Sequence, residues 1–468
     1  MDLRARLIGW AGSALLLISS SGARADKVDA YIRHAMARAH VPGVAVVVLQ
    51  AGKPPKIAAY GTADIEGSVP VTRSTAFQLA SATKLFTGIL LMRMVQEGRL
   101  ALSDPISKYI ENVPPAWRGI TVLQLASHSS GFPDAVNAGP FSDIYAVRDW
   151  AARQPPLAAP GVQSIYSQTE FALLTEILQK VSGRSFDTLL KQEIIAPLGL
   201  TTTRYSYLND ISGDPGTAVV SAKLVPGRAT IYRWSGTEQL RYEYTYPNWT
   251  HANAGLYSSA ADLAKLLIAL QGDKLLDAAS KRALGQAYRL KNGKTAPFGA
   301  AWATRRWRNR LAMGHSGGPG LSDIWIYPER KLAVAILVNS HTIFPVLADQ
   351  IAEIVDPAPP PRRARIPDAD PVLSRKLETW ASRPSIAGSG RTLIASESAP
   401  AMASLLSLLA PTVAAFGTPK SWHLVAESTD VKSNRSRTYA ASYGVGELIW
   451  TFQLSAKGQI VSAFATPD

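Results

Sequence analysis

Ser81 and Lys84 are the residues whose types and spacing most directly predict chemistry. They belong to Ser81-Ala82-Thr83-Lys84, which is the only S-x-x-K motif in the 468-residue sequence. On a helix, a separation of three residues places both side chains on one face and within hydrogen-bonding reach. The residues that follow, LFTGILLMRMVQEG, are apolar on nearly all sides, so we expect a buried helix. Burial disfavours the charged form of lysine, and a neutral amine can accept the proton of a serine hydroxyl.

The same four residues also have a purely structural explanation. A serine can cap a helix, and a lysine can extend its amine to solvent along an apolar surface. The motif is expected about once by chance in a chain of this length, so it predicts chemistry only together with other motifs. If Ser81 begins the helix, the backbone N–H groups at that end point toward negative charge that develops on a reacting carbonyl.

A second candidate segment surrounds Tyr166 in AAPGVQSIYSQTEFALLTEILQKVSGRSF. The tyrosine follows a Pro-Gly turn and precedes an amphipathic helix, which the spacing predicts from about Gln168 to Val181 with its end at Gly183. The turn and the helix start therefore hold Tyr166 and Gln168 close together.

A third candidate, Gly314-His315-Ser316-Gly317-Gly318, matches the G-x-S-x-G pattern of α/β-hydrolases. In those enzymes the nucleophilic serine lies on a turn between a strand and a helix. Here Pro319-Gly320 and the alternating strand pattern LSDIWIYP follow, which predicts a hairpin. An α/β-hydrolase that uses Ser316 therefore remains only as a remote alternative.

With S-x-x-K, the tyrosine motif and H-S-G in this order, the chain resembles the serine β-lactamase and penicillin-binding protein superfamily. The D,D-peptidase, D-aminopeptidase and esterase-like branches are the most similar. In that superfamily the three motifs are S-x-x-K, Y-x-N and K-T-G or H-x-G. The linking segments ITVLQLASHSSGFPD, HANAGLYSSAADLAKLLIAL and GHSGGPGLSDIWIYPERKLAVAILVNS fit as well, so the resemblance covers roughly residues 26–356.

The resemblance implies a role for each matching residue. Ser81 is the expected nucleophile, Lys84 its activating base, and Tyr166 the group that relays the proton to the leaving group. The backbone N–H groups of Ser81 and Gly318 are the expected oxyanion hole. The residues expected to contact the substrate are Gln168, His315, Ser316 and Gly317.

The chain departs from the superfamily pattern at two of these positions. Gln168 stands where asparagine is usual, so the amide lies one methylene further from the backbone. A competing match, Tyr246-Pro247-Asn248, keeps the asparagine, but its proline and neighbours favour a turn. His315 replaces the lysine of β-lactamases, which exchanges a permanent cation for a titratable one. This second change favours the peptidase or esterase branches.

The remaining histidines favour structural roles. His128, in SHSSG, is expected to join a hydrogen-bond network. The others have no H-x-x-x-H or carboxylate spacing typical of a metal site, and the sequence has neither a phosphate-binding glycine loop nor a dinucleotide fingerprint. We therefore expect no metal and no cofactor.

The elements that must position these residues form an α/β (α+β) sandwich with an inserted helical region. Strand patterns lie at both ends of residues 26–356, in GVAVVVLQAGKPPKIAAYGTADI and across residues 298–339, and helical patterns dominate between them. This order predicts one antiparallel sheet built from N- and C-terminal segments and flanked by helices. Residues 357–370 are rich in proline and arginine, which is typical of a linker.

Residues 371–468 then predict a small α+β accessory domain. Two helices are expected there, over Pro371–Ser382 and Pro400–Phe416, followed by three or four strands. The domain loosely resembles small cystatin-like or nuclear-transport-factor-like modules.

The N-terminus predicts export. Residues 1–25 combine Arg4 and Arg6, an apolar run from Leu7 to Ile18 and Ala23-Arg24-Ala25, which is the layout of a signal peptide cleaved after Ala25. With no cysteine in the chain, we expect a bacterial periplasmic protein without disulfides. The net charge of +14 favours anionic partners such as cell-wall material, while export argues against nucleic acid. No apolar run after the leader is long enough to span a membrane.

Together these patterns and the resemblance predict a secreted serine hydrolase that forms an acyl-enzyme with an amide or ester. The departure at His315 favours a D-amino-acid peptide, a muropeptide or an ester as substrate over a β-lactam. A catalytically silent protein that only binds peptidoglycan peptides or penicillin is the main alternative, because Gln168 departs from the motif.

Overall fold

The protein is described by a computed structural model. It covers residues 26–136, 138–206, 208–212, 219–222, 224–307, 309–342, 348–357, 364–388, 390–400, 402–403, 406, 413, 416–429, 435–443 and 446–467. The predicted leader lies outside these residues, as do residues 358–363 of the predicted linker and most of residues 400–416. Within the described ranges, no helix is long and apolar enough to cross a membrane.

A seven-stranded antiparallel sheet forms the centre of residues 26–356, in the order β11-β12-β13-β14-β1-β2-β3. Its strands are β1 (Gly43–Gln50), β2 (Lys56–Asp64), β3 (Val69–Pro70), β11 (Ala303–Trp307), β12 (Arg310–Gly317), β13 (Ser322–Tyr327) and β14 (Leu332–Val338). β1 pairs with β14 from Val44–Val338 to Gln50–Leu332. The first and last segments of this region therefore form one sheet, which confirms the predicted fold class.

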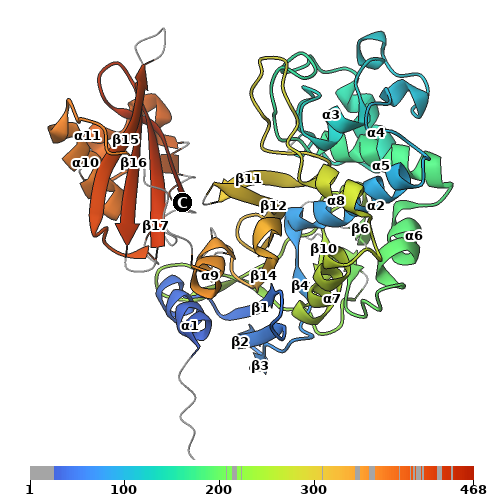
Figure 1. Ribbon diagram of the computed structural model, residues 1–468, viewed down its shortest axis with the longest axis horizontal. Coiled ribbons are helices and arrows are strands. Elements are labelled where there is room, and N and C mark those ends of the chain that lie inside the picture. Colours follow the sequence, from blue (N-terminus) through green and yellow to red (C-terminus); the bar gives the residue numbers. More distant parts are fainter. Residues whose placement is uncertain are drawn as a thin grey trace, which may run out of the picture.

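Both faces of this sheet are covered, because successive side chains of a strand point to opposite faces. Alternate residues of β1 enter different cores, Val44, Val46 and Val48 on one face and Ala45, Val47 and Leu49 on the other. Helices α1 (Lys27–Ala39) and α9 (Ala348–Val355) pack together on the first face (Figure 1). The continuous apolar sequence of β1 follows from this double burial.

The inserted helical region covers the second face (Figure 1). Its helices are α2 (Lys84–Gln96), α3 (Val122–Ala126), α4 (Ile144–Ala151), α5 (Thr169–Ser182), α6 (Phe186–Leu190), α7 (Ala260–Gln271) and α8 (Ala278–Leu284). α2 is buried on every side from Lys84 to Met92, as its apolar sequence predicts. α5 ends at Gly183, whose φ of 69° provides the left-handed cap expected there.

Short strands also occur within this region, for which the sequence prediction gives mainly helices. They are β4 (Phe77–Gln78), β5 (Arg204–Tyr205), β6 (Leu208–Ser212), β7 (Val219–Ala222), β8 (Ile231–Trp234), β9 (Gln239–Tyr242) and β10 (Leu256–Ser258). β10 pairs with β4 and β5, which are distant in sequence. Two- to five-residue strands show too little alternation to be recognised before their partners are known.

The C-terminal region forms a second, four-stranded antiparallel sheet, β15 (Ser421–Thr429), β16 (Arg435–Tyr443), β17 (Gly446–Leu454) and β18 (Ile460–Pro467). It lies to one side of the main sheet in Figure 1, with α10 (Pro371–Ser382) and α11 (Gly390–Leu393). α10 spans the residues predicted for it. Trp380 of α10 packs with Trp450 and Phe452 of β17 in a separate hydrophobic core.

Candidate active site

The turn that carries Ser81 precedes α2. Ala80–Thr83 form a single 3-10 turn, and Lys84 is the first residue of the α-helix that continues from it. Ala80 has a φ of 47°, which is a strained backbone conformation for a residue with a side chain. Ser81 itself is partly exposed, whereas the side chain of Lys84 is fully buried.

β12 packs directly against this turn. Ser322 Oγ donates a hydrogen bond of 2.7 Å to the carbonyl of Leu79, and a Cβ at Gly317 would lie 2.0 Å from the same oxygen. Glycine at position 317 is therefore what permits the two backbones to meet. This contact brings the exposed Gly318 to the same end of the sheet as Ser81.

The amine of Lys84 is surrounded by hydrogen-bond partners. Nζ lies 2.7 Å from Tyr166 Oη, 2.8 Å from Gln168 Oε1 and 3.2 Å from the carbonyl oxygen of Asn253. Burial lowers the pKa of Lys84, while Tyr166 and the nearby carboxyls of Asp134 and Glu170 act to raise it. Lys84 thus has the environment of a base and not that of a lysine that reaches solvent.

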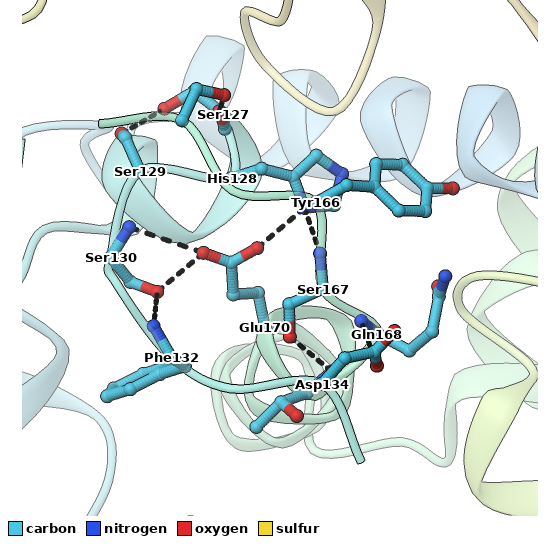
Figure 2. Close-up of polar contacts among 12 residues, drawn as sticks. Ser127, His128, Ser129, Ser130, Phe132, Asp134, Tyr166, Ser167, Gln168 and Glu170 are labelled. Atoms are coloured by element: carbon cyan, nitrogen blue, oxygen red, sulfur yellow. Dashed lines mark hydrogen bonds and ion pairs between the residues drawn. The ribbon is translucent and has the colours of Figure 1, made fainter. Parts of the chain in front are cut away.

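Two backbone hydrogen bonds fix the Tyr166–Gln168 turn. Gln168 N–H donates to Asp134 Oδ1 at 2.9 Å, and Ser167 N–H donates to His128 Nδ1 at 3.3 Å. The rings of His128 and Tyr166 pack at a centroid distance of 4.3 Å, and Figure 2 shows these side chains together. His128 therefore joins a hydrogen-bond network, as the sequence predicts.

The competing motif at residues 246–248 has a different position. Pro247 precedes a short 3-10 turn, Asn248–Thr250, and Asn248 is exposed. Tyr166, and not Tyr246, is the tyrosine that contacts Lys84.

His315 is buried, and this burial determines its charge. Its Nδ1 donates to the carbonyl of Ser316 at 2.7 Å, and its ring centroid lies 6.3 Å from that of Tyr166. Burial and the nearby Lys84 lower the pKa of His315 to about 3. With a pKa this low the imidazole is uncharged at neutral pH, so His315 does not supply the cation that lysine supplies in β-lactamases.

The hydroxyl group of Ser316 makes a hydrogen bond within the sheet. Its Oγ donates to Asp323 Oδ1 at 2.7 Å, and Asp323 also accepts hydrogen bonds from Trp325 Nε1 and from the N–H of Ala348. β12 continues through a short turn into antiparallel β13, so no helix follows Ser316. The α/β-hydrolase alternative is therefore wrong for this fold.

Several contacts of the site have no recognisable signal in the sequence. The carbonyl of Asn253 and the carboxyls of Asp134 and Glu170 reach the lysine or its turn, although the segments that contain them gave no sign of these contacts. A Cβ at Gly88 would lie 2.5 Å from Trp302, whose indole N–H donates to the carbonyl of Leu85. Only the packing of α2 reveals why glycine is needed there.

Comparison with known proteins identifies the family. A family model described as Beta-lactamase matches residues 28–356. This chain belongs to the beta-lactamase family. The matched range contains all the motifs that resemble the serine β-lactamase and penicillin-binding protein superfamily, and the match confirms that resemblance.

Curated relatives match over a shorter range. A protein named Beta-lactamase from Escherichia coli (strain K12) is 36% identical over 170 residues, which are 35% of this chain and 43% of that protein. Protein flp from Staphylococcus aureus (strain N315) is 28% identical over 199 residues, which are 40% of this chain and 39% of flp. The chain thus matches less than half the length of these relatives.

Solved structures support the same fold. The octameric penicillin-binding protein homologue from Pyrococcus abyssi aligns with a TM-score of 0.60 at 20% identity, over 94% of this chain and 89% of that chain. A D-amino acid amidase from Ochrobactrum anthropi SV3 aligns with a TM-score of 0.56 at 22% identity, over 70% of this chain and 97% of that chain. Both likenesses are evidence of fold.

Proposed function

We propose that this protein is a serine hydrolase that forms an acyl-enzyme with an amide or ester. One observation carries the proposal: the buried Lys84 Nζ contacts both Tyr166 Oη and Gln168 Oε1 one turn after Ser81. A structural lysine at this position would extend to solvent. A buried amine with a lowered pKa is instead suited to accept a proton from a neighbouring hydroxyl.

The proposed reaction has two steps, formation of the acyl-enzyme and its hydrolysis. Ser81 Oγ attacks the carbonyl carbon as its proton moves to Lys84 Nζ, and the oxyanion is held by the N–H groups of Ser81 and Gly318. Tyr166, in contact with Lys84, delivers a proton to the leaving amine or alcohol as the carbonyl re-forms, and it regains a proton from the Lys84 ammonium, which is thereby neutral again. Water then attacks the acyl-enzyme, gives its proton to the same base and releases the acid with Ser81 restored.

The neutral state of His315 bears on the choice of substrate. A buried, uncharged imidazole offers no positive charge to a substrate carboxylate. This favours substrates without a carboxylate, such as D-amino acid amides and short esters, over β-lactams. The neighbour from Ochrobactrum anthropi is described as a D-amino acid amidase, which agrees with this preference. Hydrolysis rates for a panel of D-amino acid amides, D-Ala-D-Ala peptides, short-chain esters and penicillins will test it.

The nucleophile is tested with covalent probes. Wild type, Ser81→Ala and Ser316→Ala are incubated with a fluorophosphonate or a penicillin, and the intact proteins are weighed. Loss of the adduct in Ser81→Ala alone is the expected result, because the Ser316 hydroxyl donates to Asp323. Adducts lost only in Ser316→Ala would overturn it, and no adduct in any protein would favour the silent binding protein.

The location and the accessory region are also proposals. We infer that the protein is exported to the periplasm with cleavage after Ala25, which N-terminal sequencing of the mature protein tests. We infer that residues 371–468 form an accessory domain that caps the cleft or mediates association. Unchanged activity and oligomeric state after deletion of the residues beyond Asp356 would contradict that role.

A further inference from the structure

A carboxyl–imidazole pair lies buried directly beneath the Tyr166–Gln168 turn. Glu170, on α5, and His128, in the loop after α3, are both completely buried, and Glu170 Oε2 lies 2.6 Å from His128 Nδ1 (Figure 2). Neither side chain has a part in the proposed reaction. Their burial and their position next to the tyrosine require an explanation.

The hydrogen bonds determine where the shared hydrogen lies. Ser167 N–H donates to the same His128 Nδ1 at 3.3 Å, and a backbone N–H can only donate. This contact assigns Nδ1 as the acceptor, because a hydrogen on it would compete with that of Ser167 N–H; the single lone pair of Nδ1 is then shared by two donors, and the ring hydrogen lies on Nε2, which has no hydrogen-bond partner among the described residues. The hydrogen between His128 and Glu170 consequently belongs to Glu170 Oε2.

The second oxygen of Glu170 completes this assignment. Oε1 accepts from both the N–H of Ser130, at 3.2 Å, and the Oγ–H of Ser130, at 2.5 Å. A protonated carboxyl has one donor and one carbonyl oxygen, and here each is matched to a suitable partner. The Ser130 loop, α5 and the Tyr166–Gln168 turn are thus joined through one side chain.

The surroundings favour the neutral forms of both groups. Burial raises the pKa of Glu170 well above its usual value and lowers the pKa of His128 well below its own. Asp134 raises the pKa of Glu170 further, whereas the Ser130 hydrogen bonds and Lys84 act to lower it. Lys84 and His315 lower the pKa of His128, and Ser167 N–H acts to raise it.

We propose that Glu170 is a positioning residue that stays protonated at neutral pH, donates to His128 Nδ1 and thereby holds the Tyr166–Gln168 turn against Lys84. The inference deepens the proposed function and rests on it for its effect on rate. It assigns Glu170 no contact with substrate. Its role is to fix the turn without adding a charge.

The neutral state of Glu170 affects the pKa of Lys84, which is the proposed base. Lys84 already has Asp134 nearby, and a negative charge at either carboxyl raises the lysine pKa. An ionised Glu170 would add a second negative charge near Lys84 and would favour the ammonium form, which cannot accept a proton. A protonated Glu170 supplies the same hydrogen bonds and leaves Lys84 available as a base.

A spectroscopic experiment on the full chain tests the protonation state. Infrared spectra of protein carrying ¹³C-labelled glutamate are compared for wild type, Glu170→Gln and Glu176→Gln at neutral pH. We expect a protonated-carboxyl stretching band that disappears only in Glu170→Gln. Glu176 is the matched control, because it lies on the same helix, partly buried and ion-paired with Arg148. No band lost in Glu170→Gln would overturn the proposal.

A kinetic experiment tests the positioning role. In Glu170→Gln the amide N–H₂ can donate to His128 and the amide oxygen can accept from Ser130, so we expect kcat/KM within about 3-fold of wild type and an unchanged acid limb. Glu170→Leu removes these hydrogen bonds, and we expect kcat to fall on the order of 10- to 100-fold. Thermal unfolding of each variant reports whether it is folded.

The results of these experiments distinguish a failure of this inference from a failure of the proposed function. If Glu170 is ionised, removing its charge lowers the pKa of Lys84, so an acid limb that moves to lower pH in Glu170→Gln overturns the proposal. A loss in Glu170→Gln as large as that in Glu170→Leu also overturns it. If no protein forms an acyl adduct at Ser81, the proposed function fails, and the infrared band still decides the state of Glu170.

Discussion

The fully buried amine of Lys84 lies 2.7 Å from Oη of Tyr166, whose side chain is 38% exposed. The two residues come from different elements, α2 and the turn before α5, and the contact joins the S-x-x-K motif to the tyrosine motif. An amine and a phenol at this distance can exchange a proton directly. The relationship defines the first prediction.

Replacement of Lys84 by methionine should remove acyl transfer while the protein stays folded. The loss of a proton acceptor costs on the order of 10²–10⁴ in rate, measured as the rate of acyl-adduct formation at Ser81. Lys108→Met is the matched control, because Lys108 is exposed and pairs with Asp104 at the surface. Adduct formation at the wild-type rate in Lys84→Met would show that another group is the base.

The same residue predicts the pH dependence. The neutral amine is the active form, so the acylation rate should fall as pH decreases through the pKa of Lys84. Because burial lowers that pKa, the acid limb should lie below the value of about 10.4 typical of a free lysine. Stopped-flow acylation rates across the pH range measure the limb. A limb at the ordinary lysine value would contradict the assignment.

His315 predicts how stability depends on pH. Its pKa is lowered from 6.5 to about 3, so between these values the unfolded chain binds a proton that the folded chain does not. The free energy of unfolding should therefore decrease as pH falls below 6.5. From pH 7 to pH 5 the wild type should lose about 2 kcal/mol more than His315→Gln. Urea unfolding measures both, and equal losses would refute the prediction.

Gly317→Ala should separate β12 from the Ser81 turn. The added Cβ would lie 2.0 Å from the carbonyl oxygen of Leu79, so one backbone has to move. We expect a destabilisation of about 1–3 kcal/mol together with slower acylation of Ser81. Gly119→Ala is the control, because nothing lies within 4 Å of a Cβ at that position. The two variants are compared by thermal unfolding and by adduct formation, and wild-type behaviour of Gly317→Ala would show that the contact is unimportant.

Gln168→Asn should impair the site even though it restores the residue usual in the superfamily. The shorter side chain withdraws the amide oxygen that lies 2.8 Å from Lys84 Nζ. Loss of one hydrogen bond of this kind corresponds to a rate decrease on the order of 10-fold. A single-turnover acylation assay measures it. A faster reaction in Gln168→Asn would indicate that the glutamine is a defect and would favour the silent binding protein.

The parts of the structure that local patterns determine were predictable. The uninterrupted apolar residues after Ser81 predict a helix buried on all sides, and the alternation after Pro319-Gly320 predicts a strand rather than a helix. Both predictions depend on residues that are neighbours in sequence, and both are confirmed. The short strands around β10 were missed because a two-residue strand exists only through its pairing.

Charge states were the least predictable feature of the candidate site. The sequence shows only that position 315 carries a titratable histidine, and burial lowers the pKa of this imidazole to about 3. Nothing around Glu170 in the sequence distinguishes it from an exposed helix residue, yet it lies completely buried against His128. A pKa depends on every charge and dipole within a few ångströms, and those neighbours come from several segments.

The sequence by itself determined the family motifs, the spacing that places Ser81 and Lys84 one turn apart, and the sheet formed by the N- and C-terminal segments of residues 26–356. Each of these features depends on residues that are close along the chain or on a regular alternation of apolar and polar residues. Only the tertiary structure decided that Lys84 meets Tyr166, 82 positions away, and that His128 meets Glu170, 42 positions away. Such contacts are fixed by how helices and strands pack, since burial brings distant side chains together and sets their protonation.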